Sequence, residues 1–209
     1  TTDWVTYSNQ ELGFSFEYPS NILLFNETKN QNRNSQQSFL EIKIKKISDL
    51  LENDTLGFDK ENILQHKSIL EEGKLPDTNI DWGAVDGSRK LITLDDNIYA
   101  DEFFISGRFA YDDVVFERSL IFYLNNSFIY LTLKGAPQPI ISDNPNYFID
   151  LEREYCPDCS DIELKIWDSE NNAQQNFYQD LLSNKQMGSA TIWFNLFDEI
   201  VSTFKFTNN

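Results

Sequence analysis

Cys156 and Cys159 stand three positions apart and are the only cysteines of the chain. A Cys-x-x-Cys pair can close a disulfide, hold a metal ion or carry out thiol–disulfide exchange. Exchange needs a thiol with a lowered pKa, and nearby carboxylates such as Glu154 and Asp158 raise a thiol pKa instead. A structural zinc site needs about four Cys or His ligands, and His66 is the only histidine. The pair therefore predicts a structural disulfide, with a metal site, a redox-active pair and free thiols as the alternatives.

Asp77, Asn79 and Asp81 place oxygen-bearing side chains at alternate positions, as at the start of a calcium-binding loop. Such a loop needs glycine at its sixth position and glutamate at its twelfth. This chain has Trp82 and Ser88 at those positions. A polar turn is therefore the better interpretation, and a divalent-cation site that uses the three residues is the alternative.

His66 lies among polar residues in a stretch with helical spacing, residues 48–72, which predicts an exposed histidine rather than a catalytic one. The chain contains no G-x-S-x-G, P-loop, G-x-G-x-x-G or H-E-x-x-H motif. Nucleophilic catalysis therefore has no support in the sequence. We predict a protein that is not an enzyme, with no catalytic residues and no cofactor.

The elements that must position these residues are organised around residues 119–135. Two apolar runs, 120–124 and 128–133, flank a polar stretch that suits a tight hairpin turn, because Asn tolerates a positive φ. Both runs carry apolar side chains at successive positions, as strands do in a sheet that is covered on both faces. The hairpin predicts an α/β (α+β) fold, an α/β/α sandwich with a central antiparallel sheet and helices on both faces.

The other strands and helices are predicted from periodicity. Strands are expected over residues 14–18, 39–47, 80–94 (broken by a turn at Asp86-Gly87), 98–105 and 114–124. Helices are expected within 48–72, over 172–185 and from about residue 190, with residues 204–206 running along the sheet. In the last helix an apolar stripe is formed by Trp193, Leu196, Phe197, Ile200 and Val201. Residues 136–188, rich in proline and without a clear period, are interpreted as an insertion within a single domain, 1–209.

The composition limits the partners that this chain can have. It has 17 basic and 34 acidic residues, a formal net charge of -17, so no nucleic-acid partner is expected. No apolar run approaches the ~20 residues that span a bilayer, so no transmembrane segment is expected. The first residue is Thr1 rather than Met, which we interpret as the removal of a leader. We expect an extracytoplasmic monomer, with a possible lipid anchor upstream of Thr1.

The two ends of the chain carry motifs that resemble the PsbP-like superfamily. They are Trp4 and Tyr7 followed by GFSFEYP over residues 13–19, and FDEIVSTFKF over residues 197–206. They look most like the exported lipoprotein members from bacteria. The resemblance covers the layout of residues 4–135 and 190–206, and it implies an α/β/α sandwich around an antiparallel sheet. It also implies a binding or accessory role, since its members include an extrinsic photosystem II subunit and a factor that binds the Ran GTPase. No functional residue of either matches this chain.

The sequence therefore predicts a non-catalytic protein, exported or of the cell envelope, that acts as a binding or accessory module for an unknown protein partner. One alternative is a thiol–disulfide redox factor that works through Cys156 and Cys159. Another is a divalent-cation-binding protein that uses its acidic loops.

Overall fold

A computed structural model describes residues 3–26, 37–52, 60–74, 84–107, 114–148, 172–183 and 185–207. The cysteine pair, Cys156 and Cys159, lies outside the described residues. Asp77, Asn79 and Asp81 also lie outside them. The disulfide and the cation loop therefore stay predictions.

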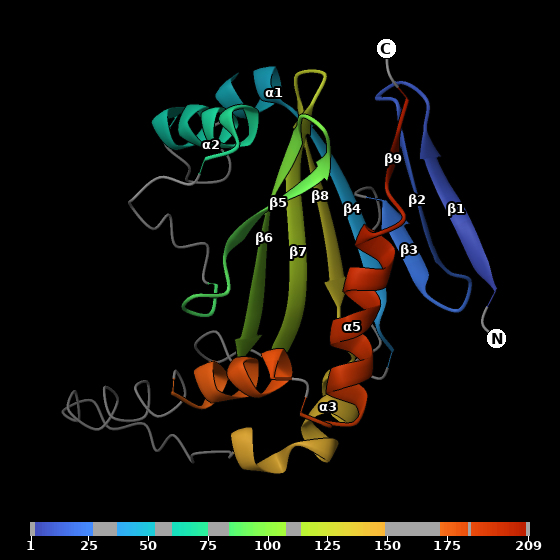
Figure 1. Cartoon of the computed structure of the whole chain (residues 1–209), viewed down its shortest axis with the longest axis vertical. Coiled ribbons are helices and arrows are strands. Elements are labelled where there is room, and N and C mark those ends of the chain that lie inside the picture. Colours follow the sequence, from blue (N-terminus) through green and yellow to red (C-terminus); the bar gives the residue numbers. More distant parts are fainter. Residues whose placement is uncertain are drawn as a thin grey trace.

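Six strands form the main sheet, in the order β3-β4-β8-β7-β6-β5 (Figure 1). They are β3 (Leu23–Asn26), β4 (Phe39–Lys46), β5 (Lys90–Asp95), β6 (Ile98–Gly107), β7 (Val115–Leu124) and β8 (Ser127–Lys134). Every neighbouring pair is antiparallel except β3 and β4, which are parallel. The parallel pair departs from the predicted antiparallel sheet. Its strands are joined by residues 27–38, a connection of the length that a parallel return requires.

The hairpin of β7 and β8 confirms the predicted turn. Leu124 pairs with Ser127, so the turn consists of two residues, Asn125 and Asn126. Both have positive φ, 48° and 60°, as the common two-residue hairpin turn requires. The two strands are the central pair of the sheet, and each has buried side chains on both faces, as predicted.

The helices lie on both faces of the main sheet, which confirms the predicted mixed α/β class. The described helices are α1 (Ile47–Glu52), α2 (Lys60–Glu72), α3 (Pro137–Asp143), the short 3-10 helix η1 (Pro145–Tyr147), a helix over residues 172–182, and α5 (Ser189–Val201). We call the two sides the α5 face and the α2 face. On the α5 face, Leu120 and Leu131 pack with Trp193, Phe197 and Ile200 of the predicted stripe. No helix in the described part of the chain is long and apolar enough to cross a membrane.

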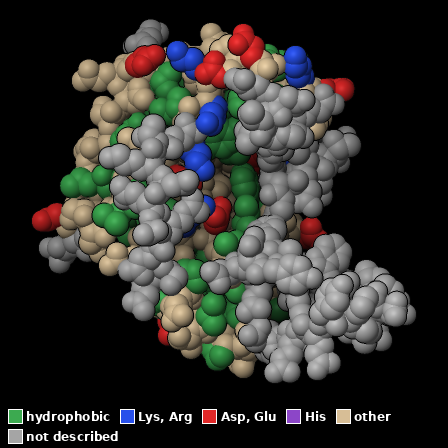
Figure 2. Space-filling model, turned by 180° about the vertical axis from the view of Figure 1, so that it is seen from behind, with side chains coloured by type: hydrophobic (Ala, Val, Ile, Leu, Met, Phe, Trp, Pro, Cys, Tyr) green, Lys and Arg blue, Asp and Glu red, His purple; other side chains and the backbone are tan. Residues whose placement is uncertain are grey.

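The α2 face has a much smaller apolar cluster, whose buried members are Leu70, Phe103, Ile121 and Phe128. It lies at the end of the sheet where α1 and α2 are found (Figure 1). Elsewhere this face carries ion pairs between strands, among them Lys134 of β8 with Glu117 of β7 at 2.6 Å and with Glu41 of β4 at 3.7 Å. Figure 2 shows such charged side chains along the sheet, between residues drawn in grey. The polar side of β4 is the wet face that its alternation predicts.

A second, three-stranded sheet has the order β1-β2-β9. Its strands are β1 (Trp4–Asn9), β2 (Phe14–Pro19) and β9 (Lys205–Phe206). The prediction that residues 204–206 run along the main sheet is therefore wrong, since β9 pairs with β2. Aromatic rings join the two sheets. Phe14 of β2 and Phe204, just before β9, each meet Phe122 of β7 edge-on at 5.5 Å.

Candidate functional site

The candidate site is an apolar groove of about 680 Å³. One wall is made of α3 and α5, and the other of the start of β1 and the turn after β2. Its apolar lining includes Trp4, Pro19, Ile22, Pro139, Ile192 and Leu196. This volume falls within the range of pockets that hold small ligands or a few side chains of a partner. Segments from both ends of the described chain therefore build one binding surface.

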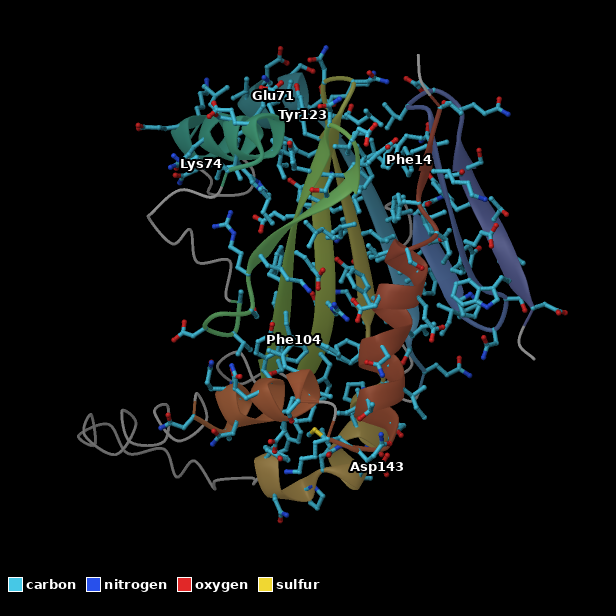
Figure 3. The ribbon with its side chains drawn as sticks, viewed as in Figure 1. Phe14, Glu71, Lys74, Phe104, Tyr123 and Asp143 are labelled. Carbon is cyan, nitrogen blue, oxygen red and sulfur yellow. The ribbon has the colours of Figure 1, made fainter. Side chains whose placement is uncertain are left out.

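The wall made of α3 and α5 is fixed where the two helices meet. Figure 3 shows Asp143 at the end of α3, beside the start of α5. Its Oδ2 accepts hydrogen bonds of 2.7 Å from both the backbone N–H and the hydroxyl of Ser189, and these bonds lower the pKa of the Asp143 carboxyl. Gly188 comes just before, with φ 56°, and a Cβ there would lie 2.4 Å from the same oxygen. Only glycine allows this carboxylate to cap α5 so closely.

The floor of the groove contains the indole of Trp193, which is only 3% exposed. One edge of the indole packs closely against Gly135. A Cβ at that position would lie 3.0 Å from Trp193 Cε2 and 2.8 Å from Ile140 Cδ1, which leaves no room for a larger residue. Trp193 Nε1 is buried and has no hydrogen-bond partner among the described residues. A buried donor without a partner costs about 1–3 kcal/mol.

The charge of the groove has one sign. Glu199 is the only ionisable side chain among the described residues that line it, and it is exposed. Thr203, four residues after Glu199 and just past the end of α5, is hydrogen-bonded to the backbone of Glu17. Trp4 pairs with Pro19, two residues further along β2. Trp4 and Glu199 are therefore found towards the same end of the groove. Trp4 is 37% exposed, and no other ring of the described residues stacks on its indole.

The hydroxyl groups of the groove are held in structural hydrogen bonds. Ser38 Oγ accepts a bond of 3.1 Å from the backbone N–H of Ala136. The hydroxyl of Ser189 donates to the Asp143 carboxylate that caps α5. No histidine, lysine or cysteine is among the described lining residues. The groove can bind through apolar contact and one charge, and its described lining offers no set of groups for nucleophilic chemistry.

A second concentration of polar side chains lies on the α2 face. His66 was predicted to be exposed, and this is wrong: only 2% of it is exposed, and its ring stacks on Phe128 at 5.5 Å. Its Nε2 lies 3.2 Å from Asp101 Oδ2, and Arg89 donates to both oxygens of Asp101 at 2.6–2.9 Å. Burial raises the pKa of Asp101, but the hydrogen bonds from His66 and Arg89 outweigh it and leave the pKa below its ordinary value. The cluster fastens α2 to β6.

A matching cluster lies on the α5 face, one residue further along β6. Arg118 donates to Glu102 Oε1 at 2.6 and 2.9 Å, to the carbonyl of Phe194 at 2.7 Å and to Asp198 at 2.5 Å. Its guanidinium also lies 4.2 Å from the centre of the Phe194 ring. Burial lowers the pKa of Arg118, but the bond to Asp198 and the charge of Glu102 raise it above its ordinary value. This cluster fastens α5 to β6 and β7.

The structure does not bring the tyrosines of the strands into the groove. Tyr123 and Tyr130 pack against the small apolar cluster of the α2 face. Figure 3 shows Tyr123 near Glu71 of α2, and Lys67 of the same helix lies 5.2 Å from the centre of its ring. The ring of Tyr99 fills the space beside Gly73. Among the described residues, no three His, Cys, Asp or Glu side chains come close enough to hold a metal ion.

The comparisons with known proteins leave the site to be interpreted from its geometry. No family model matches the chain, and a search of curated proteins finds no match. Sequence reasoning missed the groove because its described lining comes from five separate segments. One signal was present: Ile192, Leu196 and Glu199 follow one another at helical spacing along the edge of the core stripe.

Proposed function

We propose that this chain is a non-catalytic binding or accessory protein, exported or of the cell envelope, and that it holds its partner in the groove between α3, α5 and the first two strands. The observation that carries the proposal is the groove itself, whose apolar lining includes Ile192 with 74% of its surface exposed. A large apolar side chain at that exposure, next to an open apolar floor, is typical of a surface that a partner covers.

Two further observations support binding rather than catalysis. The hydroxyls of the groove are engaged in capping and backbone contacts: Ser38 accepts a backbone N–H, and Ser189 donates to the Asp143 carboxylate, whose lowered pKa makes it a weak base. The end motifs that resemble PsbP-like domains are in keeping with an accessory role.

The export part of the proposal depends on sequence alone. Its supports are the resemblance to exported lipoproteins and the expected disulfide between Cys156 and Cys159, which would be stable in an oxidising compartment. Fractionation of cells that make the full-length gene product tests this part. We expect recovery in the envelope or the medium, and recovery only in the cytosol would contradict it.

The groove is tested with N-phenyl-1-naphthylamine, an uncharged apolar dye, by titrating its fluorescence against the protein. We expect saturable binding that weakens about five- to tenfold in Ile192→Gln, because an apolar wall is lost. The matched control is Leu64→Gln, which removes an apolar side chain that is 51% exposed on α2, on the opposite face of the main sheet. Equal binding by Ile192→Gln and the wild type, or an equal loss in Leu64→Gln, would overturn the proposal.

A further inference from the structure

The charge and the aromatic lining of the groove indicate which side chains its partner should present. Of the described residues that line the groove, Glu199 alone is ionisable, so a cation meets attraction there and an anion meets repulsion. The net charge of -17 acts in the same sense at longer range. An acidic partner is therefore disfavoured both by Glu199 within the groove and by the net charge of the whole protein.

Trp4 adds a second group that prefers a cation. Tryptophan is the side chain whose ring face binds ammonium and guanidinium groups most strongly. The indole of Trp4 is partly exposed, carries no other ring of the described residues on its face, and lies towards the Glu199 end of the groove. A cation at that end would meet a carboxylate and an indole together.

The rest of the groove suits an apolar side chain. Ile192 and Pro139 line the end nearer the start of α5, and the Trp193 indole lies in the floor. One short stretch of polypeptide can supply both features that the groove suits: a basic side chain and an apolar side chain.

We propose that the groove binds a segment of a partner polypeptide in which a lysine or arginine stands beside an apolar side chain, with the basic group at Trp4 and Glu199 and the apolar group between α3 and Ile192. This inference depends on the proposed function, because it names the partner of the same groove. It does not depend on the chain being exported.

The test is selection of random heptapeptides displayed on phage against the wild-type protein, after depletion on Ile192→Gln. We expect the selected sequences to be enriched in lysine or arginine next to an apolar residue. A selected peptide is then synthesised with its basic residue and with glutamine in its place. The glutamine peptide should bind about three- to tenfold more weakly.

Two variants assign that difference to the groove. In Glu199→Gln the basic and glutamine peptides should bind within about twofold of each other, while Glu52→Gln should keep the full difference. The second variant removes the same charge from an exposed position on α1, on the α2 face of the sheet, so it controls for the net charge of the protein. Trp4→Leu should weaken the basic peptide more than the glutamine peptide.

The outcomes separate this inference from the proposed function. Selected peptides without basic residues, or a difference that survives in Glu199→Gln, would overturn the inference and leave the groove as a binding site. No selected peptides, together with saturable binding of the dye, would show that the occupant is not a polypeptide and would also overturn it. A protein that binds neither the dye nor any peptide would overturn both.

Discussion

The two faces of the main sheet hold their helices through neighbouring residues of one strand, and they do so with different strength. Successive side chains of β6 point to opposite faces, so Asp101 binds His66 of α2 while Glu102 binds Arg118 beneath α5. On the α5 face the guanidinium of Arg118 itself bonds α5, and a large apolar core surrounds it. On the α2 face a guanidinium, that of Arg89, also binds Asp101, but α2 is joined to this carboxylate through His66. On the α2 face the buried apolar cluster has four members among the described residues.

This difference indicates that the layers do not open together. The free energy that holds a layer comes mainly from its buried apolar area. The α5 layer should therefore unfold only with the whole protein, while the α2 layer depends more on its ionic cluster. Because α5 also forms one wall of the groove, the binding surface lies on the more stable of the two layers.

The largest loss of stability is expected from Arg118→Met, which removes the cation of the cluster on the α5 face. The change leaves the carboxylate of Glu102, a residue that is 5% exposed, without the partner that Arg118 provides. We expect a loss of about 3–5 kcal/mol in the free energy of unfolding, because among the described residues the buried Glu102 carboxylate then keeps only the half-exposed Lys90, at 3.4 Å, as a cationic partner. Urea denaturation measures it.

Asp198→Asn is the control for that change. The Asp198 side chain also bonds Arg118 but is 59% exposed, so its loss should cost less than about 1 kcal/mol. A loss below about 1 kcal/mol in Arg118→Met itself would show that apolar packing alone holds α5.

Asp101→Asn should produce a smaller and more local effect. It keeps the shape of the side chain but removes the charge that Arg89 and His66 contact. We expect a loss of about 1–3 kcal/mol, with faster amide hydrogen exchange over α2 and unchanged exchange over α5. The control is Asp96→Asn, at an exposed position in the turn between β5 and β6. It should change neither the free energy of unfolding nor the exchange over α2. Equal acceleration in both helices would mean that the layers open as one unit.

The smallest expected effect is a pH dependence of the stability difference between the wild type and Asp101→Asn. The pKa of Asp101 is lower in the folded protein than its ordinary value. Its stabilising contribution is therefore fully present above the unfolded value of about 3.9 and is lost as the pH falls through the folded value. We expect the stability difference between wild type and Asp101→Asn to shrink from about pH 5 to about pH 2. A difference that grows as the pH falls would mean that folding raises this pKa.

The features that sequence reasoning predicted are local ones. The β7–β8 turn depends on two adjacent asparagines, and the stripe of α5 lies within one helix. His66 was misjudged because its partner, Asp101, is 35 residues away and sits in another element. A signal existed, since Asp101 and Glu102 interrupt an apolar strand, and buried acids need cationic partners.

The second sheet and the groove could not be predicted, because periodicity says which face of an element is buried and not which distant element covers it. The β3 strand was missed for a related reason: its four residues are too few to show a period.

The pairing of β2 with β9 has a consequence for how this protein is made. Glu17 and Thr203, which contact one another at this junction, are 186 residues apart. A ribosome that adds about 5–20 residues per second completes that interval in roughly 10–40 s. Throughout it, one edge of β2 has no β9 to pair with, and Phe16 lacks the ring of Phe204. The nascent chain must therefore carry an open strand edge and uncovered aromatic rings until its last helix emerges, and these are the features that chaperones bind and that drive aggregation.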